Sequence, residues 1–207
     1  MIKKLIFTCL CLSLFISCND SKTSDSEEKE VPIEKNEEKK SNQITSTIRN
    51  TSKELDLASE VQNFMTCKKA SEERNDCRNT ITKIISQSYN LEEFVDKEKG
   101  YVIYDSIRPM IERSPQWENL GSINEDNLDQ AVSHTNNGGL ALIIDTAQTY
   151  GHVVMVLPGE TKKSGSWGMA LPKVLSLANH SPEKSFHDKT LAYALQKSDD
   201  VKVYLRK

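Results

Sequence analysis

The sequence predicts an α+β domain, with helices first along the chain and strands after them. Apolar residues recur at helical spacing between residues 57 and 111, and a strand-like pattern takes over after residue 139. The clearest strand, at 152–157, is a continuous apolar run ended by Pro158 and Gly159, as expected for a strand covered on both faces. This order of elements predicts that the helices cover one face of an antiparallel sheet.

The predicted helices begin with an amphipathic segment at 57–65, for which Thr51 or Ser52 can provide the N-cap. A second helix has its buried stripe at 81–89, and Asn75 or Asp76 is its candidate N-cap, so Cys77 is expected in its first turn. Further helices are expected at 91–94, 103–111, 125–134 and 190–196. The expected strands are 140–145, 152–157, 166–171 and 201–205.

The start of the chain predicts a lipoprotein. Residues 1–17 combine two lysines with an apolar run too short to span a bilayer, as in a secretory signal peptide. The sequence Phe-Ile-Ser-Cys at 15–18 resembles the bacterial lipobox, which implies cleavage before Cys18 and lipidation of its thiol. Residues 18–50 are expected to be the lipidated cysteine and a disordered polar tether, and 51–207 the folded domain.

Composition narrows the range of partners. The formal net charge is −3 and no basic patch interleaved with aromatic residues is present, so no nucleic-acid partner is expected. No two candidate ligands fall at a recognisable metal spacing, and neither a metal nor another cofactor is expected. We expect a monomer that contacts the membrane through its lipid anchor only, as an outer-membrane or cell-surface lipoprotein of the cell envelope.

One cysteine and one histidine stand out as chemical candidates. With Cys18 assigned to lipidation, the mature chain keeps Cys67 and Cys77. A thiol at a helix N-terminus is shifted toward thiolate by the helix dipole and the unpaired backbone amides. A neighbouring imidazole favours the thiolate further and can protonate the leaving group, and His152 at the entrance of a buried strand is the candidate.

These residues lie in a pattern that resembles a known family. The run ERNDCRNTITKI resembles the cysteine-bearing helix start of papain-like amidases of the NlpC/P60 and CHAP type, and YGHVVMVLPG resembles their histidine strand. The similarity extends to AVSHTNNGGLALIID, SGSWGMALPKV, TLAYAL and VKVYL, and so covers roughly residues 53–207. The resemblance implies a papain-like fold and a cysteine peptidase or amidase that cleaves the peptide stems of peptidoglycan. Cys77 would be its nucleophile and His152 its base and acid.

At some positions of this site the sequence departs from the family or offers no clear counterpart. Arg78 and Thr80 stand where the family favours Asn and an aromatic residue. The family orients its histidine with a polar group on the neighbouring strand. If residues 158–165 form a direct hairpin connection, residues 169–173 lie opposite His152. None of these residues is a good orienting group. Ser166 or a backbone carbonyl could serve instead.

Two further alternatives concern a cysteine and a tryptophan. Cys67 could form a disulfide with Cys77 in an oxidising compartment, which would remove the nucleophile. Trp167 is either a substrate-binding wall of the groove or a core aromatic residue.

The sequence therefore predicts a lipid-anchored cysteine hydrolase that acts on peptidoglycan. The alternative is a catalytically inactive papain-like binding lipoprotein of the cell envelope. A third possibility is a structural or immunity-type lipoprotein, which needs only the anchor and the tether.

Overall fold

A computed structural model describes residue 49 and residues 55–73, 76–149 and 151–207. These residues fall within the unit Asn42–Lys207. The predicted signal peptide at 1–17, the lipidated Cys18, nearly all of the tether at 18–50 and the caps Thr51 and Ser52 lie outside the described residues. Within the described residues, no helix has the length and apolar character needed to cross a membrane.

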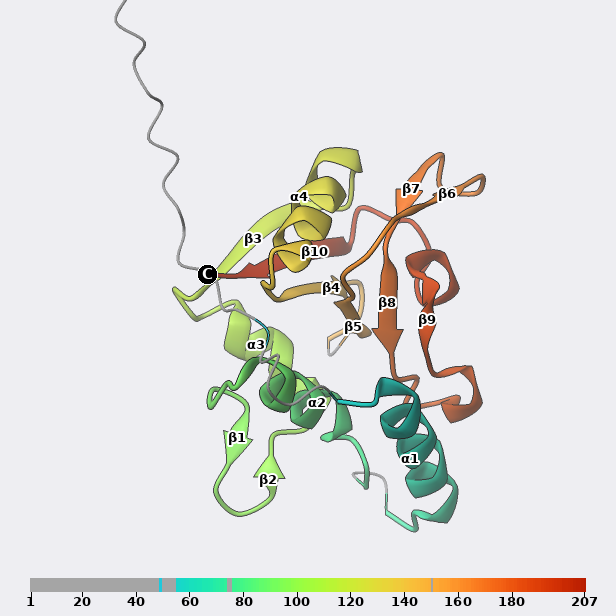
Figure 1. Ribbon diagram of the computed structural model, residues 1–207. Coiled ribbons are helices and arrows are strands. Elements are labelled where there is room, and N and C mark those ends of the chain that lie inside the picture. Colours follow the sequence, from blue (N-terminus) through green and yellow to red (C-terminus); the bar gives the residue numbers. More distant parts are fainter. Residues whose placement is uncertain (1–48, 50–54, 74–75, 150) are drawn as a thin grey trace, which may run out of the picture. The chain divides into compact units, whose positions relative to one another are not determined.

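The described part of the chain is a mixed α+β structure, and its first half is mainly helical (Figure 1). Asp56 caps the first helix, because its carboxylate accepts hydrogen bonds from the backbone amides of Ala58 and Ser59. The second helix ends at Asn90, which adopts the left-handed conformation typical of a helix C-terminus. The four helices are α1 (Leu57–Ala70), α2 (Thr80–Tyr89), α3 (Ile107–Ile111) and α4 (Glu125–Asn136).

The second half of the chain forms most of an antiparallel sheet of six strands. Its spatial order is β3 (Trp117–Ser122), β10 (Val201–Arg206), β4 (Ala141–Asp145), β5 (Val153–Val156), β8 (Lys173–Ser176) and β9 (Phe186–Thr190). Two short hairpins stand apart from it: β1 (Val95–Asp96) with β2 (Gly100–Tyr101), and β6 (Lys162–Ser164) with β7 (Met169–Leu171). Three 3₁₀ turns complete the structure: η1 (Tyr104–Ser106), η2 (Pro182–Lys184) and η3 (Leu191–Tyr193).

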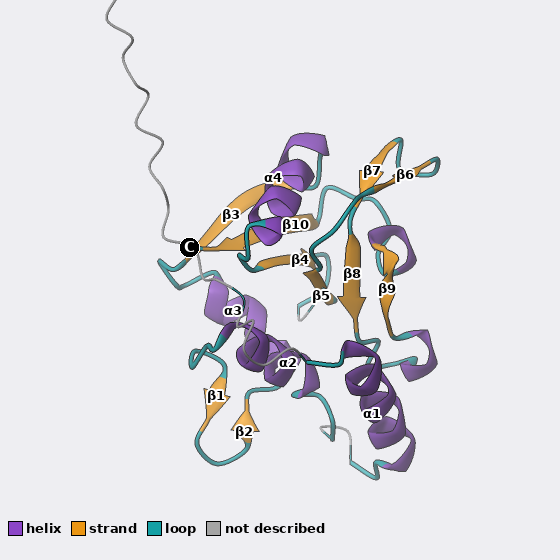
Figure 2. Ribbon diagram, in the orientation of Figure 1, coloured by secondary structure: helices purple, strands orange, loops and turns teal. Residues whose placement is uncertain are grey.

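The six-stranded sheet is covered on both faces. Successive side chains of β4 alternate: Leu142 and Ile144 pack with α1, α2 and α3 in one core, whereas Ala141 and Ile143 pack with α4 in another. Figure 2 shows α4 apart from α2 and α3, with the sheet between them. All four residues of β5 are buried, as the continuous apolar run predicts. The prediction that helices cover only one face is therefore wrong.

Several predicted elements are confirmed and others are corrected. The helices expected at 57–65, 81–89, 103–111 and 125–134 are present, and so are the strands at 140–145, 152–157 and 201–205. The segment 91–94 forms a turn that leads into β1 instead of a helix, and only 169–171 of the strand expected at 166–171 is extended. The region 190–196 contains the short η3 instead of a helix, and β3, β8 and β9 were not predicted.

Candidate functional site

His152 lies immediately before β5, and the neighbouring strand β8 supplies its hydrogen-bond partner. Val154 of β5 pairs with Ser176 of β8, so the buried hydroxyl of Ser176 lies diagonally across from residue 152. The Nε2 atom of His152 and the Oγ atom of Ser176 share a hydrogen bond of 2.8 Å. This bond fixes the plane of the imidazole.

The surroundings of His152 favour the neutral imidazole. Burial lowers the pKa of His152 below its ordinary value, because the charged ring loses hydration, while the carboxylate of Asp145 opposes this effect in part. The neutral ring carries one donor and one acceptor. At neutral pH His152 can therefore both accept and donate a hydrogen bond.

Gly151 allows the chain to enter β5 at this point. Its φ of +59° is in the left-handed region, and a Cβ atom would come within 2.0 Å of the backbone oxygen of Asp145. The backbone amide of Asp145 donates a hydrogen bond to the backbone oxygen of His152 at 3.0 Å. The end of β4 and the start of β5 are therefore held together at the histidine.

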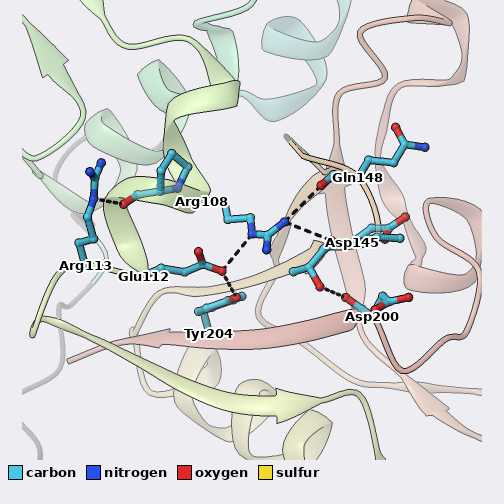
Figure 3. Close-up of polar contacts among 10 residues, drawn as sticks. Arg108, Glu112, Arg113, Asp145, Gln148, Asp200 and Tyr204 are labelled. Atoms are coloured by element: carbon cyan, nitrogen blue, oxygen red, sulfur yellow. Dashed lines mark hydrogen bonds and ion pairs between the residues drawn. The ribbon is translucent and has the colours of Figure 1, made fainter.

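The loop between β4 and β5 is tied to α3 by Arg108 (Figure 3). The Nη1 atom of Arg108 donates to the backbone oxygens of Thr146 at 3.1 Å and Gln148 at 3.2 Å, and its Nε atom pairs with Glu112 at 2.9 Å. Glu112 also accepts a hydrogen bond from the hydroxyl of Tyr204, whose pKa is raised to about 12 by burial and by this carboxylate. Arg108 thereby fixes the loop that precedes His152.

Cys77 lies in the turn before α2 and not in a helix. It has a φ of +64° in the turn that precedes α2, which begins three residues later at Thr80 with Asn79 as its N-cap. The prediction that Cys77 is in the first turn, capped by Asp76, is therefore wrong; Asn75, the other proposed cap, lies outside the described residues. The turn is stabilised by the Thr80 hydroxyl, which donates to the Cys77 backbone oxygen at 2.8 Å.

The sulfur of Cys77 is bonded to that of Cys67. Cys67 lies in the last turn of α1 and is exposed, whereas Cys77 is partly buried. The disulfide joins the end of α1 to the turn before α2 across a sequence separation of 10 residues. A cysteine in a disulfide has no thiol to deprotonate, so in this state Cys77 has no nucleophile to offer.

Arg78, the residue after Cys77, is held in a buried ion pair. Its Nη2 atom lies 2.5 Å from both carboxylate oxygens of Asp105, and its guanidinium stacks over the ring of Tyr104 at 4.7 Å from the centroid. The Tyr104 amide donates to the Arg78 backbone oxygen at 2.9 Å. Backbone and side chain of Arg78 are thus both fixed by η1.

Arg78 and His152 line the same pocket. Its volume is about 380 Å³, and its lining comes from η1, the β4–β5 loop and the segment after β8. The described lining residues are Arg78, Tyr104, Gln148, Thr149, Gly151, His152, Asn179 and His180. None of these is acidic, and Cys77 is not among them.

One atom of the pocket lacks a hydrogen-bond partner. The Oδ1 atom of Asn179 is buried and accepts no hydrogen bond from the described residues. A buried acceptor without a donor costs free energy, on the order of 1–3 kcal/mol, unless a water or a ligand supplies one. Asn179 therefore adds a buried, unsatisfied acceptor to the residues that line the pocket.

The structure separates the residues that the sequence singles out. His152 lies in the pocket, and Cys77 is next to a pocket residue but is bonded to Cys67. Trp167, proposed as a groove wall, is only 6% exposed and packs in the core on the α4 side of the sheet. Of the two alternatives stated for Trp167, its burial favours the core aromatic residue.

The residues that sequence reasoning missed come from unexpected strand pairing. A direct hairpin after β5 would place 169–173 opposite His152, but the β6–β7 hairpin fills that connection and β5 pairs with β8 instead. Ser176 therefore occupies the position for which Ser166 was proposed. A weak signal existed in the short apolar pair Val174 and Leu175, which follows Pro172 and includes a β-branched residue.

Neither metal ligands nor sequence relatives add to this picture. Within the described residues, no group of three or more His, Cys, Asp or Glu side chains could hold a metal ion. The chain matches none of the protein-family models and none of the curated proteins with which it was compared.

Proposed function

We propose that residues 51–207 form a papain-like domain that binds the peptide stems of peptidoglycan without cleaving them. In this proposal the domain is anchored to the cell envelope through lipidated Cys18 and the tether at 18–50, after removal of the signal peptide at 1–17. The observation that carries the absence of cleavage is that Arg78, and not Cys77, lines the pocket with His152. The disulfide to Cys67 in addition leaves Cys77 without a thiol.

The arrangement of elements supports a papain-like fold. The histidine stands at the start of a buried sheet strand, the neighbouring strand provides a polar partner for its ring, and a cysteine lies just before a core helix. This resembles the arrangement in papain-like amidases, in which a polar group on the adjacent strand orients the histidine. The helix start departs from that pattern, because Cys77 precedes α2 by three residues.

The chemistry of the pocket supports a peptide ligand. The guanidinium of Arg78 is paired with Asp105, so Arg78 offers a carboxylate N–H contacts and not an unbalanced positive charge. The lining itself carries no acidic residue. Asn179 Oδ1 needs a donor, which a peptide N–H supplies. Peptidoglycan stems offer both groups, because they are short peptides that contain carboxylates and amides.

A second candidate function is a cysteine hydrolase that becomes active when the disulfide is reduced. The hydrogen bond between His152 and Ser176 favours it, since an oriented imidazole is what a cysteine nucleophile requires. Ser176 is a weaker orienting group than a carboxylate, because a hydroxyl does not stabilise the imidazolium by charge.

The two functions are separated by the variant Cys67→Ala, which leaves Cys77 as a free thiol without any reductant. Full-length protein is mixed with purified peptidoglycan, and both sedimentation with the polymer and release of new amino groups are measured. We expect wild type and Cys67→Ala to co-sediment and to release no amino groups. His152→Ala should reduce co-sedimentation.

Two results would contradict the binding proposal. Release of amino groups by Cys67→Ala, but not by the double variant Cys67→Ala/Cys77→Ala, would establish the hydrolase instead. Failure of the wild-type protein to co-sediment, in oxidised and reduced form alike, would remove peptidoglycan as the ligand.

A further inference from the structure

A second cleft lies at the opposite end of strands β8 and β9 from the His152 pocket. Its volume is about 780 Å³, within the range of small-molecule sites. Thr190 at the end of β9 pairs with Lys173 at the start of β8, whereas the His152 pocket uses residues that follow β8. The cleft is lined by β6, Ser166, the end of β9 and η3.

The cleft is basic although the whole chain is acidic. It contains the ammonium groups of Lys162, Lys163 and Lys189 and the single carboxylate of Asp188. Within the described residues, none of these lysines takes part in an ion pair. A concave surface with excess positive charge attracts anionic ligands.

An exposed aromatic ring stands in this basic cleft. Tyr193 is 72% exposed, the most exposed large apolar side chain among the described residues. The ring of Tyr193 packs edge-to-face with the ring of Phe186, and the two ring centroids are 6.5 Å apart. The Nζ atom of Lys189 lies 5.7 Å from the centroid of Tyr193 and 5.5 Å from that of Phe186, so this ammonium group is held beside the exposed ring.

The walls of the cleft are tied together. Lys197, which follows η3, donates to the backbone oxygen of Trp167 in the turn of the β6–β7 hairpin at 2.9 Å. The hydroxyls of Ser164 and Ser166 are 3.2 Å apart on that hairpin, and Thr190 adds a third hydroxyl from β9. The cleft thus combines a ring, fixed positive charge and several hydroxyls on a connected frame.

We propose that this cleft binds an acidic carbohydrate, that is, a pyranose chain bearing carboxylates. The apolar C–H face of one sugar ring would stack on Tyr193, its carboxylate would meet Lys189 and Lys163, and its hydroxyls would bond to Ser164, Thr190 and Asp188. The proposal is independent of the function assigned to the His152 pocket.

The same features argue against two other anionic ligands. A simple phosphate needs neither the ring nor the row of hydroxyls. A single-stranded nucleic acid usually stacks successive bases on several aromatic residues along a basic groove, and this cleft exposes one ring and includes the carboxylate of Asp188. Asp188 suits a sugar, because a carboxylate accepts hydrogen bonds from neighbouring hydroxyls.

The test uses full-length protein and four probes, with binding followed by isothermal titration calorimetry. The probes are an oligogalacturonate, its fully methyl-esterified form, tripolyphosphate and a single-stranded oligothymidylate. We expect the oligogalacturonate to bind most tightly. Its ester, which keeps the sugar chain and loses the charge, should bind about tenfold more weakly or worse.

Variants show whether the ring and the charge act together. Tyr193→Ala and Lys189→Ala should each weaken oligogalacturonate binding about tenfold, and Tyr193→Phe should leave it within about twofold because the ring remains. Lys97→Ala removes an exposed lysine in the β1–β2 turn, so it controls for net charge and should have no effect. The double variant Lys162→Ala/Lys163→Ala provides an independent test on the hairpin.

Three outcomes would overturn the proposal. Tighter binding of tripolyphosphate would show a simple anion site, and tighter binding of oligothymidylate would show a nucleic-acid site. Undiminished oligogalacturonate binding by both Tyr193→Ala and the double lysine variant would show that the sugar binds elsewhere. Absence of binding by every probe would show that the cleft is not a site for anionic ligands.

Discussion

At the scale of single residues, the site depends on how His152 is held. Its ring nitrogen Nε2 bonds to a buried hydroxyl, and burial keeps its pKa below the ordinary value. Arg78 faces the same pocket from the other side, with its guanidinium fixed by Asp105 and Tyr104. The side chains of His152 and Arg78 are therefore both held in fixed positions by hydrogen bonds.

Replacing Ser176 with alanine should destabilise the protein by about 1–3 kcal/mol, since it leaves the buried imidazole nitrogen without its partner. Ser88→Ala is the matched control. The Ser88 hydroxyl is buried and bonds to no group among the residues that the structure describes, so its removal should be neutral or stabilising. Urea unfolding monitored by circular dichroism measures both, and equal effects of the two substitutions would contradict the role given to Ser176.

The lowered pKa of His152 predicts a loss of stability in mild acid. The unfolded chain protonates this histidine near its ordinary pKa of 6.5, whereas the folded protein resists protonation until a lower pH. The stabilising contribution is therefore complete above pH 6.5 and is lost as the pH falls from there through the folded-state pKa. The free energy of unfolding should drop more between pH 7 and pH 5 in wild type than in His152→Gln.

Burial also lowers the pKa of His134. Because His134 is present in both wild type and His152→Gln, its effect on the pH dependence of stability is the same in the two proteins. Identical pH profiles of wild type and His152→Gln would show that His152 titrates normally in the folded state.

At the scale of elements, the loop between β4 and β5 determines the shape of the pocket. It contributes Gln148, Thr149 and Gly151 to the lining, and Arg108 of α3 holds it through two backbone oxygens. Gly151 is required in this loop because a Cβ atom there would clash with the backbone oxygen of Asp145. The pocket is thus formed by a short loop that depends on a contact with a helix 40 residues away in sequence.

Arg108→Ala should release this loop while the sheet stays intact. We expect faster amide hydrogen exchange at 146–149 and a several-fold loss of stem-peptide affinity. Arg113→Ala is the matched control, because the Nε atom of Arg113 bonds to the Pro109 backbone oxygen on the same helix and not to the loop (Figure 3). Equal exchange rates in the two variants would show that Arg108 does not hold the loop.

Elements with a strong pattern could be predicted from the sequence, and those set by tertiary contacts could not. Periodic apolar residues predicted α2 and α4, and the continuous run before Pro158 predicted β5. Strands β8 and β9 were missed, because the β6–β7 hairpin lies inside a connection that was expected to be a simple turn. This error in strand pairing is also why Ser176 was missed.

The candidate site was predicted in part. The position of His152 at the entrance of β5 followed from the local sequence. The position of Cys77 outside the helix could not be predicted in this way. Cys77 lies in a left-handed turn, and the helix begins only after Asn79. Asn75 and Asp76 are residue types that cap a helix equally well, so the sequence does not distinguish these starts. The pairing of Arg78 with Asp105, 27 residues apart, is a tertiary contact that no local pattern indicates.

At the scale of the whole molecule, the disulfide joins the first helix to the rest of the domain. α1 otherwise contacts the body mainly through β9, η2 and α2 and through the buried Phe64 and Val61. A closed loop of this length stabilises a folded protein by about 2–3 kcal/mol, because it restricts the unfolded chain. The disulfide therefore has a structural role whether or not Cys77 ever acts as a thiol.

Cys67→Ala should lower the free energy of unfolding by that amount, about 2–3 kcal/mol, and Cys77→Ala should do the same, since either one breaks the bond. The double variant should be no less stable than the single ones. Urea unfolding without reductant tests this, and additive losses in the double variant would contradict a shared disulfide.

The central claim is that a peptidoglycan stem binds beside His152 and Arg78 and is not cut there. Its most direct test is a titration of full-length protein, labelled at its histidine rings with ¹⁵N, with a soluble stem pentapeptide. The ring resonances of His152 should shift to saturation while the peptide stays intact by mass spectrometry, in both wild type and Cys67→Ala. Unmoved His152 resonances, or a peptide cleaved by Cys67→Ala, would contradict the claim.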